Sequence, residues 1–304
     1  MKIFLTGACG YVGSALLPAL RDAGHEVSAI DLQWFYQDTT VGVQDVREVK
    51  SLPKGTDIVI HLAAIANDPS VAFYPRRSWE TGVLATQQLA QCAIKIGARF
   101  IYASSVSVYG ADRGLVTEDM DVHPLSDYNK TKMCAERVLL SYPGLYPQII
   151  RPATICGVAP RMRLDLTVNL FTMQALTKGK ITVHGGMQKR PSIHIDDMVG
   201  VYLWMIDHPE YHGIYNAGFE NNSLEQIANE VMQMTQANIH ITQQRDIRSY
   251  EVCSDKLLAT GFKPKYTIQD AIELLEMRYH AGLLEDKPQH YNLGWMESQG
   301  IKDE

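Results

Sequence analysis

Residues 2–13, KIFLTGACGYVG, decide the fold. A strand pattern, Ile3–Thr6, leads into glycines at positions 7, 10 and 13, and a helix pattern starts at Val12. Glycines in such a turn let the backbone approach a pyrophosphate and let the helix pack closely on the strand. The helix start adds unpaired N–H groups and a partial positive charge, which attract phosphate. A tight turn without a ligand is the alternative to the predicted dinucleotide site, which consists of Gly7, Gly10, Tyr11, Val12 and Gly13.

Acidic residues follow the next two predicted strands. Asp31 comes directly after the strand pattern Glu26–Ile30. A carboxylate at this place can bind the ribose hydroxyls of adenosine and would repel a 2′-phosphate, which favours NAD over NADP. Asp45 and Val46 follow a further strand candidate, where they can contact adenine. Read alone, Asp31 and Asp45 are equally compatible with ordinary turns.

Strand and helix patterns alternate through the first half of the chain. Such alternation predicts an α/β fold, a Rossmann-type doubly wound parallel sheet with helices on both faces. The expected strands are Ile3–Thr6, Glu26–Ile30, Asp57–Leu62, Arg99–Ser104 and Gln148–Arg151, and the expected helices are Val12–Ala23, Ser78–Ile96 and Tyr128–Ser141.

The pattern is looser after Arg151 and predicts a smaller C-terminal α/β domain that binds substrate. Ser223 and Thr267 precede two of its helices as N-caps. We predict an NAD-binding domain over residues 1–155, to which 190–215 returns, and a substrate domain over 156–189 and 216–304, with a cleft between them. The expected helices are Arg161–Lys178, Val199–Asp207, Leu224–Met234 and Ile268–Tyr279, and the expected strands are Ile181–Val183 and Ile193–Ile195.

Composition narrows the functional classes. The 304 residues include 28 Lys and Arg against 34 Asp and Glu, a formal net charge of −6, and 46% are hydrophobic. This is the profile of a compact globular protein. It argues against nucleic acid as a partner, because neutralising phosphates requires clustered basic residues. We recognise no signal peptide, no membrane-spanning apolar run and no CxxC pair among the five cysteines. We expect a cytoplasmic protein without a membrane partner or a metal site.

Tyr128 and Lys132 lie four residues apart in a predicted helix, on one face of it. A nearby ammonium stabilises a phenolate and lowers the pKa of tyrosine from its usual value of about 10. Tyr128 is therefore a candidate general acid and base. Ser105 lies where a strand ends, at the sheet edge where α/β folds bind ligands, and can hold a substrate hydroxyl against Tyr128. A solvated helix face and an ordinary strand-end serine are the alternatives.

Three further segments join these features in a family resemblance: 61–64 (HLAA), 104–110 (SSVSVYG) and 190–197 (RPSIHIDD). The chain resembles the extended short-chain dehydrogenase/reductase family over residues 1 to about 280. Within that family it is similar to the NAD-dependent nucleotide-sugar epimerase/dehydratase branch, of the UDP-glucose 4-epimerase type. The ordered set of motifs is specific for the family and only weakly specific for the sugar.

The resemblance implies NAD as the cofactor and a nucleotide sugar as the substrate. The residues that match the family's NAD contacts are Gly7, Gly10 and Gly13 for the pyrophosphate, Asp31 for the adenosine ribose, Asp45 and Val46 for adenine, Leu62, Ala63 and Ala64 beneath the cofactor, and Tyr128 and Lys132 near the nicotinamide. The residues that match its substrate contacts are Thr154, where many relatives have an asparagine, Arg190 for the nucleotide diphosphate, and Arg245 or Arg248 for a second phosphate contact. An ordinary surface arginine is the alternative for Arg248.

The chain departs from the family pattern beside the catalytic serine. Dehydratases of this branch carry a carboxylate directly after that residue, and decarboxylases tend to have a glutamate there, whereas this chain has Val106 and Ser107. The two residues disfavour 4,6-dehydration. Gly82 replaces an asparagine and Cys156 replaces a tyrosine. Arg161 and Arg163 have two interpretations. They contact a phosphate or an acidic sugar, or they are solvated charges at the start of a helix.

Three functional hypotheses follow. The first is an NAD-dependent epimerase of a nucleotide sugar, acting at C4 through transient oxidation to a keto-sugar and hydride return. The second is a net oxidoreductase, such as a 4-keto-sugar reductase. The third is a non-catalytic dinucleotide sensor, which the presence of both Tyr128 and Lys132 disfavours. By analogy with the family, the helices Ser78–Ile96 and Tyr128–Ser141 would pair in a homodimer.

Overall fold

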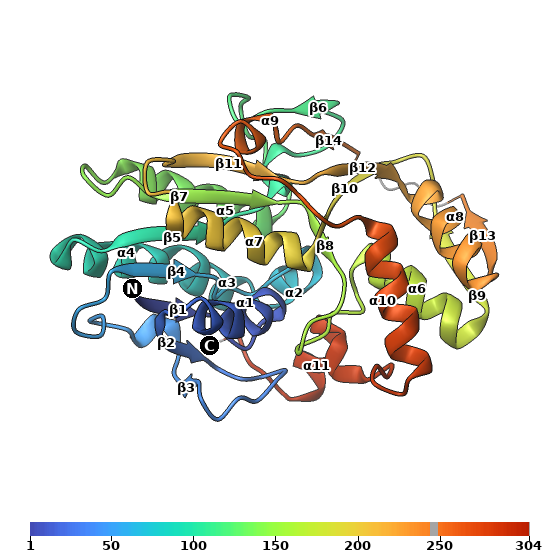
Figure 1. Cartoon of the computed structure of the whole chain (residues 1–304), viewed down its shortest axis with the longest axis horizontal. Coiled ribbons are helices and arrows are strands. Elements are labelled where there is room, and N and C mark those ends of the chain that lie inside the picture. The colour runs from blue at the N-terminus through green and yellow to red at the C-terminus, as the bar shows by residue number, and fades with distance from the viewer. Residues whose placement is uncertain (244–248, 304) are drawn as a thin grey trace.

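A seven-stranded parallel sheet forms the centre of the computed structural model, which describes residues 1–243 and 249–303 (Figure 1). The spatial order is β11-β7-β5-β4-β1-β2-β3. The chain therefore adds β2 and β3 on one side of β1, and then adds β4, β5, β7 and β11 on the other side. Ligands of such sheets bind at the carboxyl ends of the strands where the order reverses, which here is between β1 and β4. The strands are β1 (Lys2–Thr6), β2 (Glu26–Asp31), β3 (Gly42–Val43), β4 (Ile58–His61), β5 (Arg99–Ala103), β7 (Gln148–Pro152) and β11 (Gly213–Ala217).

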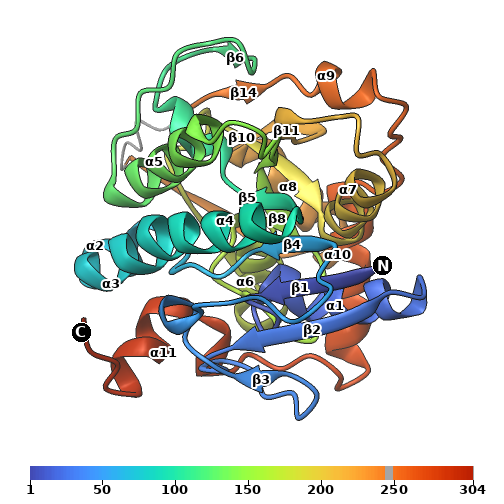
Figure 2. The ribbon, with the colours of Figure 1, turned by 90° about the vertical axis from the view of Figure 1, so that its left-hand side faces the viewer.

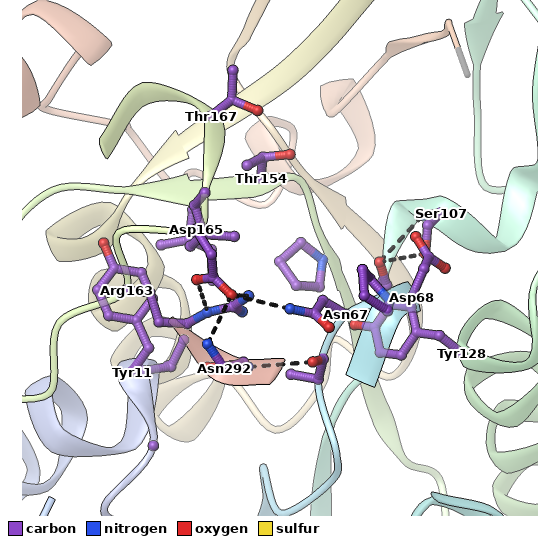
Figure 3. A pocket seen from close by; sticks show the side chains of 18 of the residues that line it. Tyr11, Asn67, Asp68, Ser107, Tyr128, Thr154, Arg163, Asp165, Thr167 and Asn292 are labelled. Carbon is purple, nitrogen blue, oxygen red and sulfur yellow. Dashed lines mark hydrogen bonds and ion pairs between the residues drawn. The ribbon is translucent and has the colours of Figure 1, made fainter. Parts of the chain in front are cut away.

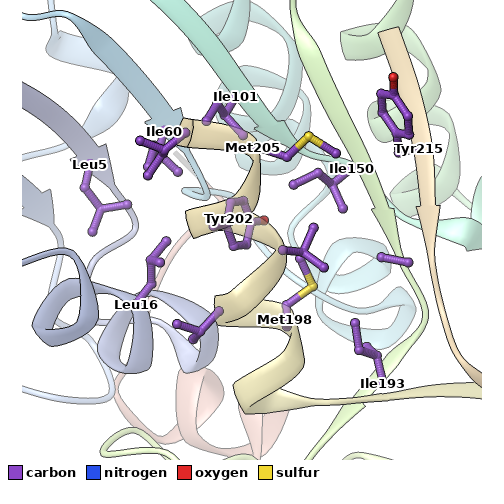
Figure 4. Packing of buried hydrophobic residues seen from close by; sticks show 14 of the residues in the cluster. Leu5, Leu16, Ile60, Ile101, Ile150, Ile193, Met198, Tyr202, Met205 and Tyr215 are labelled. Atoms are coloured by element: carbon purple, nitrogen blue, oxygen red, sulfur yellow. The ribbon is translucent and has the colours of Figure 1, made fainter. Parts of the chain in front are cut away.

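Helices cover both faces of this sheet, and the expected doubly wound fold is confirmed (Figure 2). Successive strand residues point to opposite faces of the sheet. Leu5 joins Leu16 and Tyr202 in one core (Figure 4), and Phe4 joins Leu89 in the core on the other face. Burial on both faces explains the continuous apolar strand patterns. The first face carries α1 (Tyr11–Asp22) and α7 (Ile195–Asp207), and the second carries α4 (Ala85–Ile96) and α5 (Asp127–Ser141).

A smaller α/β half lies at the carboxyl edge of the large sheet. Three of its helices, α6, α8 and α10, share a core with β9. Its strands are β8 (Thr154–Cys156), β10 (Lys189–His194) and β12 (Glu220–Ser223) in one sheet, β9 (Lys180–His184) with β13 (Asn238–Thr242) in another, and β6 (Leu115–Val116) with β14 (Glu251–Val252) in a third. Its helices are α6 (Thr167–Lys178), α8 (Leu224–Thr235), α9 (Asp255–Leu258) and α10 (Ile268–His280).

Two helix starts in this half are confirmed and one is wrong. Ser223 and Thr267 cap α8 and α10, and each forms a capping box with the residue three positions later. The helix expected from Arg161 begins only at Thr167. Arg161 and Arg163 precede it in an irregular segment, where both side chains are buried. The predicted helix Ser78–Ile96 is also divided, into α3 (Pro75–Trp79), a π-helical turn (Glu80–Leu84) and α4.

Two parts of the chain connect the two halves. Within residues 190–215, β10 pairs with β8 and β12, whereas α7 packs on α1 and β11 pairs with β7 in the large sheet. The last helix, α11 (Asn292–Ser298), contacts α2 (Asp68–Phe73) of the N-terminal half. The remaining short helices are η1 (Val46–Glu48), η3 (Val106–Tyr109) and η4 (Pro288–His290).

Within residues 1–243 and 249–303, no helix is both long enough and apolar enough to span a membrane.

Candidate active site

A cavity of about 880 Å³ lies between the large sheet and the smaller half (Figure 3). It extends from the glycine-rich turn after β1 to Ser105, Tyr128 and Lys132. Its volume is in the range of ligand and cofactor sites, roughly 300–1,000 Å³. The structure thus brings both ends of the predicted site into one space.

The glycine-rich turn has the close packing that the motif predicts. Gly7 has a φ of +76°, and a Cβ atom there would lie 2.7 Å from the backbone nitrogen of Ala63. A Cβ atom on Gly13 would lie 2.0 Å from the carbonyl oxygen of Gly7. In the described structure no side chain caps α1 at Gly10, and no acidic residue lies in the first turn. The open helix N-terminus faces the cavity and fits a pyrophosphate.

Asp31 is held beside this turn. It accepts hydrogen bonds from the backbone N–H groups of Cys9 (3.1 Å) and Gln33 (2.6 Å). Burial raises the pKa of its carboxyl group, and these two bonds oppose the rise. The carboxylate therefore has a fixed place at the end of β2, as a contact with the adenosine ribose requires.

Asp45 and Val46 have different surroundings. Asp45 accepts the backbone N–H of Arg47 (2.9 Å) and pairs with its guanidinium, which lowers the pKa of Asp45 although burial acts to raise it. It lines a second cavity of about 460 Å³, and Trp34 lines both this cavity and the first. The side chain of Val46 is buried in the core with Phe4. Only Asp45 of the pair therefore presents its side chain to a cavity.

The segment after β4 passes beside the glycine-rich turn. Leu62 and Ala64 line the main cavity, whereas the backbone of Ala63 packs against Gly7. His61, just before them, bonds to Thr6 (2.7 Å) and Thr86 (2.9 Å). Burial lowers the pKa of His61 to about 3, so this residue is a neutral part of the core.

Ser105, Tyr128 and Lys132 converge although they come from separate elements. Ser126 caps α5 by accepting the N–H of Asn129, and the helix then turns Tyr128 and Lys132 toward the cavity. The Lys132 ammonium donates to the carbonyl oxygen of Ala103 at the end of β5 (2.7 Å). Ser105 follows β5, and its hydroxyl lies 2.8 Å from that of Ser107.

The protonation of this group differs from the expectation. Burial raises the pKa of Tyr128, and a hydrogen bond with Ser105 opposes the rise. The expected net lowering of this pKa is therefore not found, and the Lys132 ammonium donates to the carbonyl oxygen of Ala103. Burial lowers the pKa of Lys132 to about 8, against the opposing charge of Glu136. Ser105 is therefore the residue that most favours the phenolate.

Arg161 and Arg163 are neither solvated nor helical. Arg163 forms two hydrogen bonds with Asp165 (2.9 and 3.0 Å). Arg161 donates through Nη2 to Asn292 and lies 4.3 Å from the ring centre of Phe35. Within the described part of the chain, its Nε and Nη1 atoms are buried without a hydrogen-bond partner, and the residue lines the main cavity. A buried guanidinium in this state calls for an anion.

Comparisons with known proteins bear directly on this arrangement. A profile of the NAD dependent epimerase/dehydratase family matches residues 3–218. The chain belongs to this family. NAD is accordingly the cofactor of this enzyme. The packed glycine-rich turn, the fixed Asp31 carboxylate and the unpartnered Arg161 atoms all fit a bound dinucleotide.

Relatives of this family member differ in their reactions. An uncharacterised UDP-glucose epimerase of Bacillus subtilis (strain 168), YtcB, is 31% identical over 231 residues, which are 66% of this chain and 70% of that protein. UDP-glucuronic acid decarboxylase 1 of Xenopus tropicalis is 27% identical over 262 residues, which are 77% of this chain and 60% of that protein. The crystal structure of UDP-glucuronic acid 4-epimerase from Bacillus cereus in complex with UDP-glucuronic acid and NAD has a TM-score of 0.80 and 25% identity, over 92% of this chain and 100% of that one.

The substrate contacts expected from the family are only partly described. Thr154 and Arg190 line the main cavity, and Arg190 also donates to the carbonyl oxygen of Lys189 (3.1 Å). Arg245 and Arg248 lie outside the described residues. Cys156 is fully buried, and burial raises the pKa of its thiol.

Three polar residues at the cavity were missed by the sequence analysis. Asn67 donates to Asp165 (3.1 Å), Asp68 accepts from Ser126, and Asn292 binds Arg161 (Figure 3). Asn67 and Asp68 come within four residues of the HLAA segment, and this closeness in sequence could have pointed to them. Asn292 had none, because its partners are far away along the chain.

Proposed function

We propose that this enzyme epimerises a nucleotide-activated sugar, at C4 of the sugar ring. The observation that carries the proposal is the convergence of Ser105, Tyr128 and Lys132 in the cavity that also contains the dinucleotide turn. Val106 and Ser107 follow Ser105, so the positions where dehydratases carry a carboxylate hold no acid or base here. The absence of an acid or base at these two positions favours a reaction that needs only one proton-transfer residue.

The proton chemistry falls to Tyr128. NAD, when bound, supplies the hydride acceptor and donor for the sugar carbon. The Tyr128 phenolate takes the proton of the C4 hydroxyl, Ser105 holds that hydroxyl in place, and Lys132 keeps a positive charge beside them at neutral pH. The keto-sugar then rotates in the cavity, and Tyr128 returns the proton to the C4 oxygen. Orientation and proton transfer are the effects that the residues contribute.

UDP is the nucleotide that the relatives favour. The Bacillus subtilis and Xenopus tropicalis proteins are both named after a UDP-sugar. The Bacillus cereus structure contains UDP-glucuronic acid. Arg190 and the unpartnered atoms of Arg161 supply positive charge to the cavity for the anionic parts of substrate and cofactor.

A panel of UDP-, GDP-, dTDP- and CDP-sugars tests this function. A specific ligand should raise the melting temperature by mass action, and an epimerase should convert its substrate to the C4 epimer with no net use of NAD. A net oxidoreductase, the second candidate, would consume added NADH or NAD in proportion to product. Stoichiometric consumption would therefore replace the proposal with that candidate.

The pH dependence of turnover follows from Ser105. Its hydrogen bond lowers the pKa of Tyr128, which burial raises. Ser105→Ala removes this bond, so the phenolate forms only at higher pH. We expect the ascending limb of the kcat profile to move to higher pH and kcat at pH 7 to fall about tenfold or more. Ser105→Thr keeps the hydroxyl and should keep the profile. An unchanged limb in Ser105→Ala would remove Ser105 from this role.

The homodimer stays a prediction. The helices expected to form it expose apolar side chains at Ile94 in α4 and Leu140 in α5, 39% and 49% accessible. Light scattering that gives the mass of two chains would support it, and the mass of one chain would reject it.

A further inference from the structure

The end of the chain lies against the cofactor half of the molecule. Figure 2 shows α11 and the C-terminus beside α2 and α3. Met296 in α11 is buried against Tyr74, and Leu293 and Ile301 join the same cluster with Trp34. We refer to residues 291–303 as the C-terminal strap. It lies beyond the 3–218 segment that matches the family.

Directional hydrogen bonds hold the strap in place. The indole N–H of Trp295 donates to the carbonyl oxygen of Trp34 (2.7 Å). The Asp303 carboxylate accepts the backbone N–H groups of Arg76 (3.1 Å) and Arg77 (2.8 Å) at the start of α3. Arg77 also donates through Nε to the carbonyl oxygen of Lys302 (3.1 Å) and lies 5.3 Å from the ring centre of Trp34. The strap therefore ties the loop after β2 to α3.

The space under the strap continues the cofactor site. Trp34 lines both the main cavity and the second cavity, and it follows Asp31 by three residues. Asp45 lines one side of the second cavity, and Ile301 and Lys302 of the strap line another. If Asp45 contacts adenine, as the family resemblance implies, the adenine end of NAD would lie in this second cavity.

The inner end of the strap contacts the main cavity. The amide oxygen of Asn292 accepts from Nη2 of Arg161, its amide nitrogen donates to the carbonyl oxygen of Ala66 (3.3 Å), and its backbone N–H donates to Asp165 (3.3 Å). The bond from Asn292 holds the Arg161 side chain, whose Nε and Nη1 atoms have no partner among the described residues. The backbone N–H of Arg161 donates to Ser14 of α1 (3.1 Å).

We propose that the C-terminal strap forms the outer wall of the NAD site and retains the cofactor by enclosing its adenosine half. The ligand that it recognises is the adenosine monophosphate portion of NAD. Release of NAD requires the strap to leave Trp34 and α3, so its hydrogen bonds slow dissociation. The inference concerns the cofactor alone and is independent of the sugar and of the reaction.

The test uses the holoenzyme with point variants, because α11 covers apolar side chains that truncation would expose. The double variant Trp295→Phe/Asp303→Asn removes the indole hydrogen bond to Trp34 and one of the two carboxylate hydrogen bonds at the start of α3. It keeps an aromatic ring at position 295 and an amide of the same shape as the carboxylate at position 303. Gln299→Ala, an exposed change in the strap, is the matched control. Exchange of bound radiolabelled NAD against unlabelled NAD measures dissociation, with no sugar present. We expect at least about tenfold faster exchange in the double variant and wild-type exchange in the control.

Half-ligands locate the effect. AMP should bind the double variant about tenfold more weakly than the wild type, whereas the affinity for nicotinamide mononucleotide should be unchanged. An exchange rate of NAD equal to that of the wild type, or equal weakening of both half-ligands, would overturn the inference. The proposed epimerase activity could fail on every sugar without affecting these measurements.

Discussion

Tyr128→Phe is expected to lower kcat by about 10²–10⁴-fold, the usual contribution of a general acid and base. The substitution removes only the phenolic oxygen from a ring that stays packed against the cluster of Ile65, Val71 and Tyr74. We therefore expect NAD binding and the unfolding transition to remain close to those of the wild type. Steady-state turnover of the best nucleotide sugar, together with the bound NAD per chain, is the measurement.

Tyr142→Phe is the matched control for this variant. Tyr142 follows the same helix α5 at its far end, and its hydroxyl accepts a hydrogen bond from Gln91 on the surface (3.1 Å). The control should keep full activity. Turnover by Tyr128→Phe within a few-fold of the wild type would show that another residue moves the proton.

Arg151→Met is expected to have the largest effect on stability. Arg151 and Glu136 form a buried pair, 3% and 4% exposed, with hydrogen bonds of 2.8 and 2.6 Å between β7 and α5. Removal of one partner leaves an uncompensated buried charge and costs about 3–5 kcal/mol. The total stability of a domain is only about 5–15 kcal/mol. Urea unfolding of the NAD-free protein should show this loss.

A double variant and an exposed pair serve as controls for the stability prediction. Glu136→Gln combined with Arg151→Met removes both charges and should recover part of the loss. Lys130 and Asp127 form an exposed pair on the same helix (3.2 Å, side chains 46% and 43% exposed), and Lys130→Met should cost less than about 1 kcal/mol. A loss below 1 kcal/mol in Arg151→Met would contradict the role of the buried pair.

The same pair links stability to the site. Glu136 lies one helical turn after Lys132 and also accepts a hydrogen bond from Ser104. Its charge opposes the lowering of the Lys132 pKa by burial. Glu136→Gln should therefore also make Lys132 lose its proton at lower pH.

Most of the fold could be predicted from local sequence signals, because each signal depends only on a few neighbouring residues. The glycines at 7, 10 and 13, the apolar strand patterns and the caps Ser223 and Thr267 depend on neighbouring backbone alone. The helix expected from Arg161 failed for a different reason. Helical periodicity does not reveal that two arginines are buried by Asp165, Phe35 and Asn292, because two of these partners are more than 120 positions away.

The convergence of the candidate site residues follows from the order of the strands. Ser105 follows β5, and Tyr128 lies at the start of α5. The topology alone therefore brings both residues to the carboxyl edge of the sheet. The strap could not be predicted in this way. Trp295 meets Trp34 across 261 positions, and Asp303 meets Arg76 across 227. Contacts of that separation depend on how the last helix packs, which no short pattern specifies.

The central claim is that one hydrogen leaves C4 of the sugar and returns to C4. A UDP-sugar that carries deuterium at C4, incubated with the holoenzyme, tests it directly by mass spectrometry and NMR of the product. We predict a C4 epimer that retains the deuterium, with no accumulation of NADH. Loss of the deuterium to solvent, or one NADH for each product molecule, would contradict the account.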